Sequence, residues 1–183
     1  NGNQINVRGY RMLWIGTTNQ LDNIFAGLNA GQATSTGVAN SFFGTNSGQA
    51  NSTGNGNAFF GWQTGSANTT GGDNTFVGGS PGTSNTIGSR NSFIGRLSGS
   101  ASNDGNDNAA FGMQSMSANT SGSRNTILGA SSGASLTSGN NNTALGYQAD
   151  VSAGLTNATA LGNQAKATPS NSMVLGSING VNG

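Results

Sequence analysis

The chain has 183 residues, of which 32 are glycine, six are cationic and five are acidic. Cysteine, histidine and glutamate are absent, which excludes thiol nucleophiles, imidazole bases, disulfides and His/Cys metal sites. The formal net charge of +1 gives no electrostatic footprint for nucleic acid or anionic lipid, and no apolar run approaches the ~20 residues of a membrane span. We therefore predict a non-enzymatic protein with no catalytic or metal site, no cofactor, no nucleic-acid partner and no membrane-inserted segment.

Residues 1–22 lack the periodicity that begins at residue 23. They contain a cluster of large apolar and aromatic side chains, which are Tyr10, Met12, Leu13, Trp14 and Ile15. The first unit of a stacked array needs its open edge covered. We therefore predict that residues 1–22 form an N-terminal cap or junction.

From residue 23 a five-residue motif recurs: asparagine, a small residue, two mainly apolar residues and glycine. The glycines that end eight successive pentads are spaced by 17 residues, and they are Gly27, Gly44, Gly61, Gly78, Gly95, Gly112, Gly129 and Gly146. Two shorter units end at Gly162 and Gly176. More glycines stand four and ten residues after most pentads, with Met116 and Asp150 as exceptions at the first of these positions. Glycine at fixed offsets indicates turns with positive φ or close backbone approach.

A 17-residue period with short apolar runs and no helical pattern predicts an all-β fold. The fold class that fits is a parallel β-solenoid or β-roll, with one coil per repeat, over residues 23–176. At ~4.8 Å per coil, ten units make a rod section of roughly 50 Å. Residues 177–183 are predicted to be a C-terminal connection.

The two apolar residues of each pentad form two columns along the stack. Neighbouring residues of a strand point to opposite faces, and all eight phenylalanines lie in these columns. The strand is therefore predicted to be buried on both sides, although each coil has too few apolar residues to cover both sides itself. We predict that one column packs inside the coil and the other packs against neighbouring chains in a homotrimer. The alternative is a monomeric two-layer solenoid that covers its outer face internally.

The pentads, with links such as those at 67–71 and 118–122, resemble the head-type repeats of trimeric bacterial and phage fibre proteins. The resemblance is to tail-fibre-like surface proteins that end in an intramolecular chaperone domain, including the mosaic adhesive trimers of predatory bacteria. The units at 159–167 and 171–176 are similar to head repeats of YadA-like trimeric autotransporter adhesins. The resemblance covers residues 23–176 and implies a homotrimeric fibre that is extracellular, on a bacterial surface or a virion. Since no anchor or chaperone domain is present, we expect a segment of a longer protein.

Two further columns have predicted structural roles. The first residue of each pentad is expected to form an amide ladder along the stack, through Asn23, Asn40, Asn57, Asn74, Asn91, Asn108, Asn125 and Asn142. The column before it alternates in charge, through Asp73, Arg90, Asp107 and Arg124. We expect each arginine to lie between two carboxylates, so that slippage by one coil opposes like charges.

The column directly after the pentad glycines varies most, which indicates that these positions face solvent or a partner. Trp62 and Tyr147 are candidates for stacking on sugar rings, and Arg96 is a candidate for a polar contact. The alternative is that these side chains fill grooves between chains.

Three functions remain open. The first is an adhesive fibre section that binds a host or prey surface glycan or protein, and the second is a structural spacer. The third, a polysaccharide-cleaving tailspike, is disfavoured because glycosidases use a carboxylate pair. Ice binding is a remote alternative, because it needs a flat face with a regular lattice of threonines. The Ser/Thr rows of this chain are interrupted at Ile87, Asn103 and Asp104. A calcium-binding β-roll needs an aspartate in every unit and is excluded.

Overall fold

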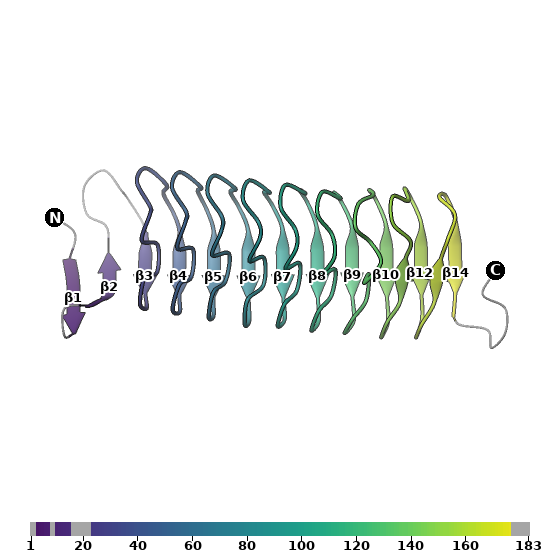
Figure 1. The fold of residues 1–183 in the computed structure, drawn as a ribbon, viewed down its shortest axis with the longest axis horizontal. Helices are drawn as coiled ribbons and strands as arrows, with labels where there is room; N and C mark the ends of the chain where they lie inside the picture. Colours follow the sequence, from purple (N-terminus) through teal and green to yellow (C-terminus); the bar gives the residue numbers. More distant parts are fainter. Residues whose placement is uncertain (1–2, 8–9, 16–22, 177–183) are drawn as a thin grey trace.

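The computed structural model describes residues 3–7, 10–15 and 23–176. Its regular elements are all strands, and the coils stack in single file into a rod (Figure 1). The strands of the stack are β3 (Ile24–Ala26), β4 (Ser41–Phe43), β5 (Ala58–Phe60), β6 (Thr75–Val77), β7 (Ser92–Ile94), β8 (Ala109–Phe111), β9 (Thr126–Leu128), β10 (Thr143–Leu145), β12 (Thr159–Leu161) and β14 (Met173–Leu175).

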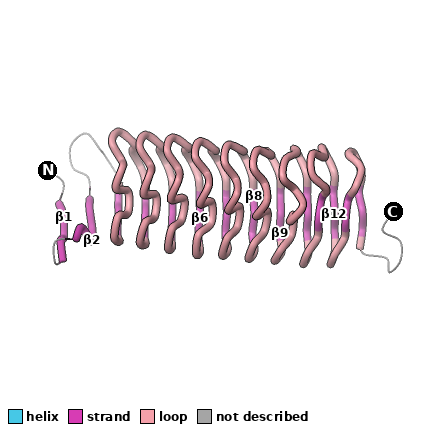
Figure 2. The backbone as a smooth tube through the Cα atoms, viewed as in Figure 1, coloured by secondary structure: helices cyan, strands magenta, loops and turns pink. Residues whose placement is uncertain are grey.

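These ten strands form one parallel sheet in which each strand pairs with the same pentad positions of the next coil. Phe42 of β4, for example, lies opposite Phe59 of β5. The strands line up in one band and loops make up the rest of each coil (Figure 2). The predicted parallel β-solenoid with 17-residue coils is therefore confirmed.

The sheet continues past the first coil into an antiparallel hairpin. β1 (Asn3–Val7) pairs with β2 (Tyr10–Ile15), and β2 pairs antiparallel with β3, with Trp14 opposite Phe25. The free edge of the first parallel strand is thus occupied by backbone pairing, where the sequence predicts a cap. The predicted C-terminal connection, residues 177–183, lies outside the described residues.

The two shorter C-terminal units also form coils. β12 pairs with β10 and β14 pairs with β12, both in parallel. A second sheet of two short strands, β11 (Asp150–Val151) and β13 (Lys166–Ala167), runs along these last coils. Lys166 Nζ lies 3.7 Å from Asp150 Oδ2 across this pair. The shorter repeats thus keep the stack but replace part of the loop with a second strand.

The middle residue of each strand faces the inside of the coil and forms the core. In the N-terminal half this column is a phenylalanine stack with ring centroids 4.8–4.9 Å apart, through Phe25, Phe42, Phe59, Phe76 and Phe93. In the C-terminal half the same positions hold the smaller residues Ala110, Ile127, Ala144, Ala160 and Val174. The coil spacing matches the distance at which stacked rings remain in contact.

The glycine four residues after each pentad makes room for the phenylalanine ring. Gly48 has a φ of +55°, and a Cβ placed on it would lie 2.5 Å from Cε2 of Phe42. The exception at Met116 coincides with the first coil whose inward residue is an alanine, Ala110. Met116 is fully buried, so its side chain fills volume that a phenylalanine occupies in the other coils.

Candidate functional surfaces

The outer face of the sheet carries an exposed apolar stripe. The last residue of each strand points outward, and from residue 43 onward it is apolar at every coil: Phe43, Phe60, Val77, Ile94, Phe111, Leu128, Leu145, Leu161 and Leu175. Phe43 and Phe60 are 36% and 40% exposed, and their rings stack with centroids 5.0 Å apart. We call these nine residues the outer stripe.

The outer stripe is the second apolar column of the pentads, which the sequence predicts to pack against neighbouring chains, and that packing between chains stays a prediction. Within one chain only the middle residue of each strand is buried inside the coil, and the outer stripe remains exposed or half-buried. Within the described residues, the chain therefore does not cover its own outer face as the alternative two-layer monomer would. Monomeric soluble proteins rarely expose contiguous apolar surface over such a length.

The first residues of the pentads form a buried amide ladder inside the coils. The backbone N–H of Asn40 donates to Oδ1 of Asn23 at 2.7 Å, and Nδ2 of Asn40 donates to the carbonyl of Gly54 at 2.9 Å. The same backbone bond recurs at each later coil up to Asn142. These asparagines satisfy backbone groups that the turn would otherwise bury unpaired, so their role in the structure is internal.

A second amide ladder, which sequence reasoning missed, lies seven residues after the pentad glycines. Asn68 Nδ2 donates to Asn51 Oδ1, and Asn85 Nδ2 donates to Asn68 Oδ1, both at 2.8 Å. Both ladders converge on one carbonyl per coil: Gly71 O accepts from Asn57 and Asn68. The recurrence of asparagine at this offset was the available signal. The ladder stops at Ser102, whose shorter side chain leaves Asn85 Oδ1 buried without a hydrogen bond.

Restoring this ladder is expected to stabilise the protein. In Ser102→Asn, the new Nδ2 can donate to Asn85 Oδ1 as in the preceding coils, so we expect the free energy of unfolding to rise by about 0.5–1.5 kcal/mol. Urea denaturation measures this change. The same substitution at the exposed Ser84 is the control and should be close to neutral. A loss of stability in Ser102→Asn would contradict the assignment.

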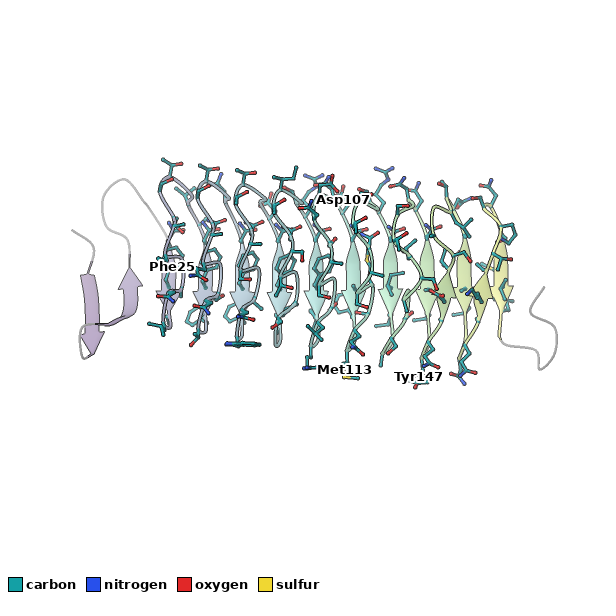
Figure 3. All side chains as sticks on the ribbon, viewed as in Figure 1. Phe25, Asp107, Met113 and Tyr147 are labelled. Carbon is teal, nitrogen blue, oxygen red and sulfur yellow. The ribbon has the colours of Figure 1, made fainter. Side chains whose placement is uncertain are left out.

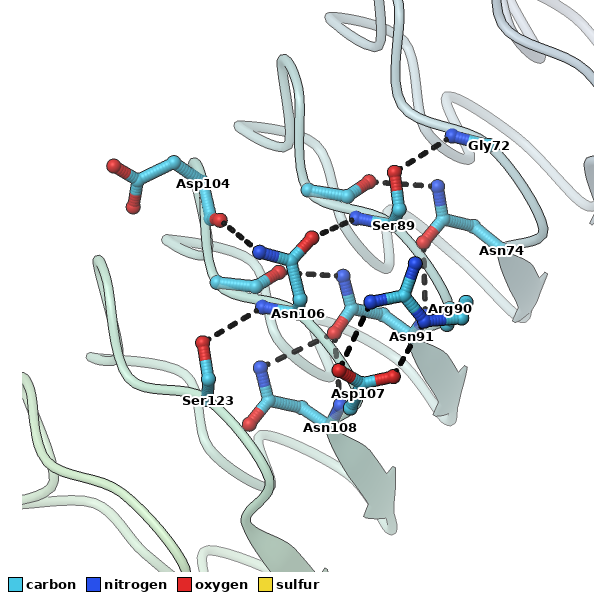
Figure 4. Close-up of polar contacts among 12 residues, drawn as sticks. Gly72, Asn74, Ser89, Arg90, Asn91, Asp104, Asn106, Asp107, Asn108 and Ser123 are labelled. Atoms are coloured by element: carbon cyan, nitrogen blue, oxygen red, sulfur yellow. Dashed lines mark hydrogen bonds and ion pairs between the residues drawn. The ribbon is translucent and has the colours of Figure 1, made fainter.

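The charged column follows one edge of the stack and forms a single strong pair (Figure 4). Arg90 binds Asp107 through two hydrogen bonds, Nε to Oδ1 at 2.6 Å and Nη2 to Oδ2 at 3.0 Å. Arg124 donates instead to Oδ1 of Asn141 in the following coil. The carboxylate of Asp73 turns back over Gly56 of the preceding coil, 2.5 Å from where a Cβ of that residue would lie.

The expectation that each arginine lies between two carboxylates is therefore wrong. Both arginines extend toward the following coil, whereas both aspartates lean toward the preceding one. Of the steps in this column, only Arg90–Asp107 forms an ion pair. This pair is largely exposed, so its value for stability is small.

Breaking the pair is expected to show in the titration of Asp107. The hydrogen bond from Arg90 is the main cause of a lowered Asp107 pKa, and the charge of Arg124 adds to it. In Arg90→Gln the pKa of Asp107 should rise toward its ordinary value, and NMR titration measures it. A carboxyl with a lowered folded pKa stabilises the fold above its unfolded pKa, and this contribution disappears as pH falls through the folded pKa. Arg124→Gln is the control and should give a smaller rise; an equal rise would contradict the geometry.

The opposite edge carries the column that directly follows the pentad glycines, which we call the variable edge. Met113 and Tyr147 lie along it in Figure 3, at the other ends of the strands from Asp107. Trp62 and Arg96 occupy the equivalent position of their coils and are exposed, as is Tyr147. The exposed fractions of Trp62 and Tyr147 are 57% and 56%. The three predicted ligand-binding residues therefore share one edge, but separate coils carry them.

The described residues enclose no pocket and contain no group of three or more metal-ligating side chains. In the same part of the chain, no helix has the length and hydropathy that crossing a bilayer requires. The candidate sites are thus surfaces along the rod: the outer stripe and the variable edge. We found no match between this chain and any protein-family model, curated protein or solved structure.

Proposed function

We propose that this chain is a section of a homotrimeric fibre, displayed on a bacterial surface or a virion, that holds a cell-surface ligand. The observation that carries the proposal is the outer stripe, which presents an apolar side chain at nine successive coils. A rod of this kind gains most by burying the stripe against copies of itself, because the stripes of identical chains share the same coil spacing. The number three comes from the resemblance of the repeats to trimeric fibre heads.

Such a fibre works by display and avidity rather than by catalysis. Three parallel chains present three copies of every surface site, and linked weak sites bind more tightly than one by about 10²–10⁴-fold. The surface that remains outside the proposed interface is nearly neutral and rich in Asn, Ser and Thr, which suits hydrogen bonding to a glycan or a protein.

The second candidate is a pure spacer that projects another domain. It is favoured by the internal use of so many polar side chains, since both asparagine ladders are buried in the coils and serve the stack. A spacer requires the outer stripe but makes no use of exposed aromatic rings on the variable edge.

Binding of the labelled chain to a panel of bacterial and animal cells separates these functions. An adhesive section is expected to bind some cells, and Phe60→Ser, which weakens the stripe, should reduce both assembly and binding. Thr70→Ser, at an exposed position outside both the outer stripe and the variable edge, is the control and should change neither. A chain that assembles but binds no cell in the panel would contradict the adhesive function and leave the spacer.

A further inference from the structure

Large side chains on the variable edge come with an amide neighbour. The next residue is an asparagine or glutamine wherever the edge residue is large and uncharged, and a serine where it is glycine or alanine. The pairs are Leu28–Asn29, Trp62–Gln63, Met113–Gln114 and Tyr147–Gln148, against Gly79–Ser80 and Ala130–Ser131. The smaller edge residues Thr45 and Asn163 are also followed by an amide, in Asn46 and Gln164. Each aromatic ring of the variable edge is thus followed in the chain by a side chain that can both donate and accept hydrogen bonds.

The backbone holds these amides in a fixed place. Gln63 and Gln148 both have a φ of +53°, in the left-handed region, and their N–H groups donate to carbonyls of the preceding coil at 2.9 and 3.0 Å. Gln148 is further held by Gln164, whose Nε2 donates to its Oε1 at 3.1 Å. The backbone of the edge is therefore hydrogen-bonded from coil to coil.

The chemistry of the edge suits a neutral sugar polymer. Indole and phenol rings offer flat apolar surfaces to the C–H face of a pyranose, and amides bind its hydroxyl groups. Between residues 28 and 164, the edge residues and their following neighbours include no carboxylate, and Arg96 is the one charged residue among them. Neither an acidic polymer nor a basic one is specified by this surface.

The two aromatic sites are five coils apart, which places Trp62 and Tyr147 roughly 24 Å from one another along the rod. A single sugar or a short branch cannot contact both rings. An extended chain that runs parallel to the rod axis can, because the coils stack in a straight line (Figure 1). A polysaccharide that coils into a helix, by contrast, would stay in contact with a straight edge only over a short distance.

From this arrangement we propose that the variable edge is a track for an extended, neutral, β-1,4-linked polysaccharide, with Trp62–Gln63 and Tyr147–Gln148 as its two stacking sites. The proposal deepens the adhesive function above and rests on it. Once one site is occupied, the second binds the same polymer intramolecularly, so affinity depends on polymer length.

Calorimetry with β-1,4-linked N-acetylglucosamine and glucose oligomers, from disaccharide to octasaccharide, tests the track. For one of the two series we expect weak binding of short oligomers, and a rise of roughly 10²-fold once the oligomer spans both rings. Trp62→Ala and Tyr147→Ala should each remove the rise. Ile87→Ala, which removes an apolar side chain that is 55% exposed but lies off the variable edge, is the control and should keep it.

The outcomes separate this proposal from the trimer. No binding by either series, no dependence on length, or a rise that survives both alanine substitutions overturns the track. Loss of assembly in Trp62→Ala or Tyr147→Ala also overturns it, because the rings then fill grooves between chains. A length-dependent rise in a chain whose mass is monomeric supports the track and refutes the trimer alone.

Discussion

Replacing Phe59 by alanine is expected to lower the free energy of unfolding by about 3–5 kcal/mol. The ring is fully buried and stacks on Phe42 and Phe76 with centroids 4.8 Å away on both sides. The coils above and below are held at their spacing by the sheet and by the asparagine ladders, so the cavity cannot collapse. Urea denaturation followed by circular dichroism measures the loss.

The adjacent Phe60 provides a matched control, since the same substitution removes the same ring from the outer stripe. Phe60 is partly exposed in the single chain, so Phe60→Ala should cost clearly less when unfolding is measured at dilutions where the chain is monomeric. If the outer stripe joins copies of the chain as we propose, Phe60→Ala should instead weaken their assembly. Equal losses for the two variants under these conditions would contradict the assignment of inner and outer columns.

Substitutions that enlarge residue 110 and shrink residue 116 are expected to have strongly coupled effects on the free energy of unfolding. Ala110→Phe alone places a ring against Met116 and should cost about 1–3 kcal/mol. Met116→Gly alone leaves a cavity and should cost about 2–5 kcal/mol. The double variant recreates the phenylalanine–glycine pair of the preceding coils and should lie close to the unmodified chain in stability.

A double-mutant cycle measured by denaturation gives the coupling energy, which we expect to be at least about 3 kcal/mol, at or above the upper end of the usual range. Gly99→Met is the control, because it adds the methionine to a coil that keeps its phenylalanine. There Phe93 is retained, and a Cβ on Gly99 would lie 2.5 Å from its ring, so the substitution should only destabilise. Additive losses at residues 110 and 116 would show that the two side chains do not share the same volume.

The period of the sequence was sufficient to predict the solenoid, its coil length and the pentad asparagine ladder, because stacking places equal offsets one above another. It was not sufficient to say which apolar column lies inside. Phe42 and Phe43 are chemically identical, and only the direction of the chain at β4 decides that Phe42 is buried. The sequence shows Met116 as an exception in a column of glycines. The reason for the exception became clear only from the structure, in which the preceding glycines of this column lie against the phenylalanine rings.

The charged column shows a second limit. The one-repeat spacing of Asp73, Arg90 and Asp107 predicts that they lie at the same position of successive coils. It does not predict the direction in which each side chain leans. All three residues have φ between 57° and 60°, in the left-handed region that the sequence did not indicate for non-glycine residues. Side-chain direction follows from that backbone, so the pairing of Arg90 with Asp107 alone could not be predicted.

Sedimentation equilibrium of the unmodified chain tests the central claim, that the outer stripe joins copies of this rod, most directly. We expect the mass of three chains, and a shift toward the mass of one chain when Phe60 and Leu145 of the stripe are replaced by serine. A monomeric mass for the unmodified chain at micromolar concentration, with the stripe left in water, would contradict it.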